Sequence, residues 1–163
     1  MSFSKPIFII DDDRRDREML ERALRHVMPE ARFRSFAVLE DSYGPILQDK
    51  PQCIILDDYL SHMNALDTLP FMKRMSMDGR IIIVASSLVR GRKEVLTAAG
   101  CADYLAKPDI ASDPQILSDA IHALALKRKA AAERKQQQPS LFDRFPELQN
   151  LPPLEPRDRR RSV

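Results

Sequence analysis

The stretch IFIIDDD, residues 7–13, places three acidic residues directly after a run of four apolar ones. A run this short and wholly apolar is typical of a buried strand rather than of a helix. Asp13 is a suitable N-cap for a following helix, and Asp16 lies three residues on, where a carboxylate can accept hydrogen bonds from open N–H groups. Apolar residues then recur at helical spacing as far as Pro29. The stretch predicts a strand that leads through acidic residues into a helix.

The same alternation of short apolar runs and helical patterns continues along the chain. Strands are expected at residues 7–10, 31–36, 53–56, 81–85 and 102–106. Helices are expected between Asp13 and Pro29, at 42–48, 66–77 and 92–99, and from Pro114 onward. Strands that alternate with helices imply right-handed crossovers and a parallel sheet. The predicted fold is therefore a doubly wound α/β domain with five strands and five helices.

Charge and proline content divide the chain near residue 127. Residues 127–163 hold 10 of the 26 Lys and Arg residues but only 5 of the 24 Asp and Glu residues. The formal net charge of +2 for the whole chain conceals this basic C-terminal segment and the mildly acidic remainder. Residues 139–163 contain five prolines and no helical period, so they cannot build a core of their own. We therefore expect one globular domain at residues 1–127. The remainder, 128–163, is expected to form an extended end of the last helix and a proline-rich C-terminal arm.

Several classes of protein are excluded by composition. No apolar stretch approaches the roughly 18 residues that a membrane-spanning helix needs, so no membrane association is expected. Cys53 and Cys101 lie in apolar surroundings, which favours reduced thiols and a cytoplasmic protein. The basic end RDRRR, residues 157–161, has neither interleaved aromatic residues nor a recognition helix, so specific nucleic-acid binding is not expected.

Acidic residues and one lysine follow three of the expected strands. Asp11 and Asp12 follow the first strand, Asp57 follows the third, and Lys107 follows the fifth. The carboxyl ends of parallel strands share one edge of the sheet, where ligands bind. Converging carboxylates require a cation, and hard oxygen ligands suit Mg²⁺. The set is suited to phosphoryl transfer, with one carboxylate as nucleophile; the alternative is that these acids only cap a helix and begin a loop.

These residues resemble the receiver domain of two-component response regulators over about residues 5–127. The resemblance rests on four motifs: IFIIDDD (7–13), CIILDDYLSHMNALD (53–67), IIIVASS (81–87) and AGCADYLAKP (99–108). It implies a flavodoxin-like sheet with strand order 2-1-3-4-5. Because residues 127–163 are too few and too rich in proline for a winged helix, we expect a stand-alone, CheY-like receiver that signals through protein contacts.

The resemblance also implies a role for each site residue. Asp57 would accept a phosphoryl group from a sensor histidine kinase or a phosphotransfer protein. Lys107 would contact the phosphoryl oxygens, with a cis peptide bond before Pro108, and Tyr104 would be the switch aromatic. The implied ligands of Mg²⁺ are Asp11, Asp12, Asp57 and the backbone carbonyl of Tyr59.

Two departures from the family pattern fall near the acceptor. Ser61 stands where the family usually has proline and Ala65 where it has glycine, so the loop is expected to be less rigid. The switch hydroxyl after the fourth strand is assigned to Ser86 if one deletion is allowed. Without a gap the position falls on Ala85, which would weaken coupling, and both assignments stay open.

Two segments of the sequence indicate partners for the chain. The start of the chain, residues 7–24, resembles stand-alone receivers paired with phytochrome-like kinases. A homodimer is expected, and apolar residues in the arm are anchors for it; they are Leu141, Phe142, Phe145, Leu148, Leu151 and Leu154. The arm could be exchanged between two copies of the chain, fold back on its own domain or engage a kinase. The alternatives are a degenerate or phosphate-sink receiver and an aspartyl-phosphate phosphatase of the haloacid dehalogenase type. That phosphatase needs a second acid two residues after the nucleophile, where this chain has Tyr59.

Overall fold

The computed structural model describes residues 5–75, 77 and 79–137 of the chain. The chain divides into two compact units, Met1–Lys127 and Arg128–Val163. The sheet and the expected site belong to the first unit. In the second unit, the described residues 128–137 form the end of helix α6 (Gln115–Gln137). The apolar residues of the expected C-terminal arm lie outside the described residues.

A five-stranded parallel sheet forms the centre of the first unit. Across the sheet its strands are β2 (Phe33–Phe36), β1 (Ile7–Ile10), β3 (Cys53–Asp57), β6 (Ile81–Ala85) and β7 (Asp103–Ala106). A separate two-stranded hairpin, β4 (Tyr59–Leu60) and β5 (Met63–Asn64), follows β3. Without this hairpin the order reads 2-1-3-4-5, so the predicted flavodoxin-like, doubly wound α/β fold is confirmed.

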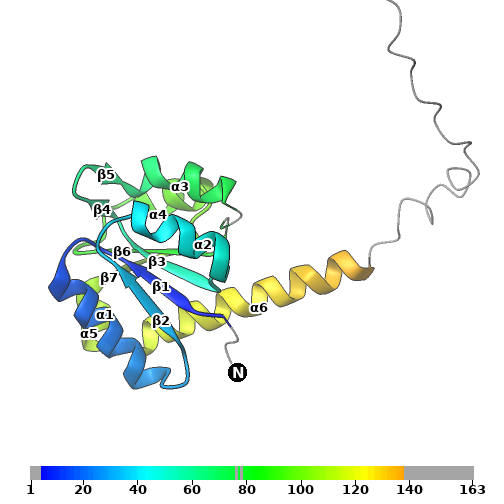
Figure 1. Cartoon of the computed structure of the whole chain (residues 1–163), viewed down its shortest axis with the longest axis horizontal. Helices are drawn as coiled ribbons and strands as arrows, with labels where there is room; N and C mark the ends of the chain where they lie inside the picture. Colours follow the sequence, from blue (N-terminus) through cyan, green and yellow to red (C-terminus); the bar gives the residue numbers. More distant parts are fainter. Residues whose placement is uncertain (1–4, 76, 78, 138–163) are drawn as a thin grey trace, which may run out of the picture. The chain divides into compact units, whose positions relative to one another are not determined.

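Helices cover both faces of this sheet (Figure 1). Beside the short η1 (Glu40–Ser42), the helices before α6 are α1 (Arg14–Val27), α2 (Tyr43–Asp49), α3 (Ala65–Arg74), α4 (Arg92–Ala98) and α5 (Lys107–Ser112). Helices α2, α3 and α4 lie on one face, and α1, α5 and the start of α6 lie on the other. None of the helices among the described residues is long and apolar enough to cross a membrane.

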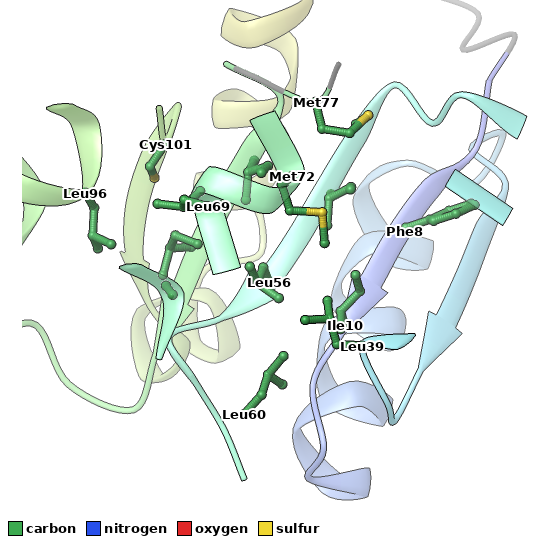
Figure 2. Packing of buried hydrophobic residues seen from close by; sticks show 14 of the residues in the cluster. Phe8, Ile10, Leu39, Leu56, Leu60, Leu69, Met72, Met77, Leu96 and Cys101 are labelled. Atoms are coloured by element: carbon green, nitrogen blue, oxygen red, sulfur yellow. The ribbon is translucent and has the colours of Figure 1, made fainter. Parts of the chain in front are cut away.

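The core consists of two apolar clusters, one on each face of the sheet. Alternate residues of β1 point to opposite faces, so Phe8 and Ile10 join one cluster while Ile7 and Ile9 join the other. Figure 2 shows the first cluster, in which Leu69 and Met72 of α3 pack beside β1 and β3. Because the central strands are buried on both faces, their sequences are continuous apolar runs rather than alternating ones.

The described part of the chain contains one α-helix more than the sequence predicted. Helix α5 begins at Lys107, and Pro108 occupies its first turn, where the missing N–H group of proline costs no hydrogen bond. Ile110 of this helix is fully buried, which anchors the short segment against the second cluster. The expected cis peptide bond before Pro108 is wrong, because no peptide bond among the described residues is cis.

Candidate functional site

The carboxyl edge of the sheet carries the three acids expected from the sequence. Asp11 follows β1 directly, and Asp57 is the last residue of the neighbouring strand β3. Carboxylate oxygens of Asp11, Asp12 and Asp57 all lie within 4.8 Å of one another. Asp11 is fully buried and Asp57 is 8% exposed, whereas Asp12 is exposed to solvent. The three side chains thus form one cluster that is open to solvent on the side of Asp12.

Lys107 places its ammonium group among these carboxylates. Its Nζ atom lies 2.7 Å from Oδ2 of Asp11 and 2.9 Å from Oδ1 of Asp57. A third partner is Asp16 of α1, whose Oδ2 atom lies 2.5 Å from Nζ. The sequence assigned Asp16 to the start of the helix, but Asp13 alone supplies the N-cap bonds to the backbone N–H groups of Arg15 and Asp16. Asp16 therefore belongs to the site, a role that its spacing in the sequence did not indicate.

Burial sets the protonation behaviour of the buried acids. It raises the pKa of Asp11 to about 6, and it also raises the pKa of Asp57, although Lys107 opposes both shifts. For Lys107 burial alone would lower the pKa, but the bonds to Asp11, Asp16 and Asp57 together raise it above its usual value. The cluster therefore holds more negative charge than one lysine neutralises.

The donor set fits a hard divalent cation. All three clustered side chains offer carboxylate oxygens, which are the ligands that Mg²⁺ prefers. Oδ2 of Asp11 is buried and accepts no hydrogen bond of good geometry, even though the Lys107 ammonium lies 2.7 Å away as an ion pair. Tyr59 begins β4, and its backbone N–H donates to the Asp57 carboxylate, while its side chain is 65% exposed. A cation bound here would offset the excess of negative charge.

The two candidate switch positions lie at the end of β6, the neighbour of β3, and Tyr104 lies one strand further, on β7. Tyr104 is 3% exposed, and its hydroxyl lies 3.3 Å from the carbonyl oxygen of Ser87. Ala85 is buried at the end of β6 and pairs with Ala106, the residue before Lys107. Ser86 follows the strand and is exposed. The register thus brings Ala85 rather than Ser86 across from the end of β7. The assignment of the switch hydroxyl stays a prediction.

An ion pair next to Asp57 was not predicted from the sequence. Arg92, the first residue of α4, donates from Nε and Nη2 to the two carboxylate oxygens of Asp58, at 2.6 and 2.5 Å. Their side chains are only 22% and 13% exposed, and the Tyr104 hydroxyl lies 3.4 Å from the same carboxylate. The partners are 34 residues apart, so no local pattern reveals them. The contact ties α4 to the residue after Asp57.

Removal of the positive charge of Arg92 should lower the stability of the chain more than removal of the positive charge of Lys93. Arg92→Gln leaves a half-buried carboxylate without its cation and is expected to lower the free energy of unfolding by about 2 kcal/mol. Lys93→Gln is the matched control, since it breaks an exposed pair with Asp103 and should cost less than about 1 kcal/mol. Urea unfolding of both variants measures the difference, and equal losses would contradict the prediction.

The fold and the site together define a class of protein. The strand order, the carboxylates at the carboxyl edge and the lysine that follows the last strand are those of a flavodoxin-like signalling domain. The chain belongs to the family of response regulator receiver domains, whose model matches residues 7–121. The family recognised in the sequence is thereby confirmed.

The chain matches only part of the length of two curated relatives. A nitrate/nitrite response regulator protein homolog from Haemophilus influenzae is 37% identical over 93 residues, which is 50% of this chain and 45% of that protein. The nitrate/nitrite response regulator protein NarP from Escherichia coli is 37% identical over 84 residues, or 52% of this chain and 38% of that protein. The chain thus spans less than half the length of either relative.

A solved structure agrees with the fold. The signal receiver domain of a putative Luxo repressor protein from Vibrio parahaemolyticus superimposes with a TM-score of 0.65. The two share 19% sequence identity over 77% of this chain and 96% of that one. At this identity the likeness supports the architecture alone.

Proposed function

We propose that the chain is a phosphoacceptor that takes a phosphoryl group onto Asp57 from a sensor histidine kinase or a phosphotransfer protein. The observation that carries this proposal is the position of Lys107 Nζ, 2.9 Å from the carboxylate of Asp57 and 2.7 Å from that of Asp11. In the proposed site Asp57 is the nucleophile and Lys107 contacts the phosphoryl oxygens. The proposed ligands of Mg²⁺ are Asp11, Asp12, Asp57 and the backbone carbonyl of Tyr59.

The transfer forms one bond and breaks another. A carboxylate oxygen of Asp57 attacks phosphorus, and the bond from phosphorus to the donor breaks, so that the donor leaves with the electron pair. When bound, Mg²⁺ supplies positive charge against the oxygens of the group in transit. Lys107, held near Asp57 by Asp11 and Asp16, adds a second cation that can donate to those oxygens. The product is the phosphorylated chain itself, so the protein acts as a switch rather than as a turnover enzyme.

Contacts around Asp58 offer a route from the acceptor to a surface. The added phosphoryl group brings about −1.5 to −2 charges at neutral pH, close to the Asp58–Arg92 pair and the hydroxyl of Tyr104. We propose that Tyr104 is the switch residue and that the output passes through protein contacts. A buried Ala85 at the end of β6 favours, as a second candidate, a receiver that drains phosphate with weak coupling.

The phosphatase alternative is less well supported. Its second acid would have to be Asp58, and that carboxylate is held by two hydrogen bonds from Arg92. We assign residues 1–127 to the receiver domain and 128–163 to the extended helix end and arm. A cytoplasmic location, a phytochrome-like kinase as donor, a homodimer formed through the arm and the absence of specific nucleic-acid binding stay predictions.

The proposal is tested by intact mass after incubation with acetyl phosphate. With Mg²⁺ the full chain is expected to gain one phosphoryl group, because the small donor bypasses the unidentified kinase. Chelation of Mg²⁺ before the donor is added should abolish the gain. A chain whose mass does not change under either condition would be a degenerate receiver, and the proposal would be wrong.

A further inference from the structure

Ser61 makes two contacts with Asp12. The backbone N–H of Ser61 donates to Oδ2 of Asp12 at 2.8 Å, and its hydroxyl donates to the same oxygen. The residues are 49 positions apart, and Ser61 lies in the turn between β4 and β5. These bonds hold the pKa of Asp12 below its usual value, with the hydroxyl as the largest cause. The turn is thereby tied to one of the clustered carboxylates.

Proline could form neither contact. Ser61 has a φ of +37°, in the left-handed region that side chains rarely adopt, whereas proline is locked near −65°. Proline also lacks the N–H group that reaches Asp12. The departure from the family pattern therefore adds a connection between the turn and Asp12, where the sequence suggested only a less rigid loop.

Asp12 is the member of the cluster that most needs such support. Lys107 holds Asp11 and Asp57 from within the cluster, and both are buried. Asp12 is exposed, and a hollow of about 260 Å³ opens beside it, lined also by Leu60 and Ser61. An exposed carboxylate rotates freely unless it is bonded, and fixing it at the moment of cation binding costs entropy.

We propose that Ser61 is a positioning residue for the cation site, an inference that rests on the proposed function. An oxygen with two lone pairs that already accepts two hydrogen bonds has no capacity left for a metal ion. The two hydrogen bonds from Ser61 therefore use Oδ2 of Asp12 and leave Oδ1 free to bind the cation. Partners that orient metal ligands commonly change affinity by about 10–100-fold. Loss of the hydroxyl alone is expected to fall at the lower end of that range, because the N–H contact survives.

The test is the affinity of the full chain for Mg²⁺ itself, measured by calorimetric titration. Ser61→Ala is expected to weaken Mg²⁺ binding about ten-fold. Ser61→Gly also lacks the hydroxyl but relieves the left-handed backbone, so an equal loss in both variants assigns the effect to the hydroxyl. His62→Ala, in the same turn, is the matched control and should bind as the parent chain does.

Phosphoryl uptake gives a second measurement. If Ser61 acts through the cation, the uptake defect of Ser61→Ala is expected to disappear at saturating Mg²⁺ and to persist at limiting Mg²⁺. Parent-like Mg²⁺ affinity in both Ser61 variants overturns the inference and leaves the proposed function standing. A parent chain that binds no Mg²⁺ overturns both.

Discussion

The Asp57→Asn variant is expected to gain no phosphoryl group from acetyl phosphate and Mg²⁺ under conditions in which the parent chain gains one. The amide is close in shape to the carboxylate, so it fills the same space at the end of β3. It lacks the anionic oxygen that must attack phosphorus, and the expected loss is therefore complete rather than partial. Intact mass spectrometry measures uptake directly and needs no knowledge of the partner kinase.

Asp58→Asn is the matched control for this experiment. It removes the adjacent acid, whose carboxylate is directed to Arg92 rather than to Lys107. We expect Asp58→Asn to retain phosphoryl uptake even though it weakens the contact with α4. Uptake that survives in Asp57→Asn and fails in Asp58→Asn would move the nucleophile to Asp58 and contradict the assignment.

The fold could be predicted from the sequence because its strongest signals are local. The runs at β1, β3 and β6 are wholly apolar and too short for helices, and only a sheet covered on both faces buries such runs completely. The acids at the ends of β1 and β3 then lie close together because the carboxyl ends of parallel strands share one edge of the sheet. Helix α5 was not predicted because its six residues have no amphipathic period. The buried side chain of Ile110 anchors it instead.

The central residues of the site were likewise predictable, and their partners were not. Asp11 and Asp57 are placed by strand ends, which the sequence locates to within a residue. Arg92 and Ser61 reach the site through contacts 34 and 49 residues apart, and such pairings depend on the angles at which α4 and the β4–β5 turn lie. Hydropathy patterns carry no information on those angles. Contacts of this kind become visible only in three dimensions.

The burial of Asp11 should make the stability of the chain depend on pH. Its pKa rises from 3.8 to about 6 on folding, so between these values the folded state keeps a proton that the unfolded state has lost. The free energy of unfolding is therefore expected to fall as pH rises through this window. Above pH 6 the cost is complete, and a shift of about two pKa units corresponds to about 3 kcal/mol. Asp11→Asn removes this cost because the amide carries no charge.

Urea unfolding at pH 4 and pH 7 tests this expectation. The free energy of unfolding of Asp11→Asn should exceed that of the parent chain by about 2–3 kcal/mol at pH 7 and by much less at pH 4. Asp41→Asn, which changes an exposed acid, is the control and should stay within about 0.5 kcal/mol of the parent at both values. Mg²⁺ at pH 7 should recover the stability of the parent chain, because a cation among the carboxylates offsets the same charge. It should do much less for Asp11→Asn, since that variant has lost a ligand; equal stabilisation of both chains by Mg²⁺ would place the cation away from Asp11.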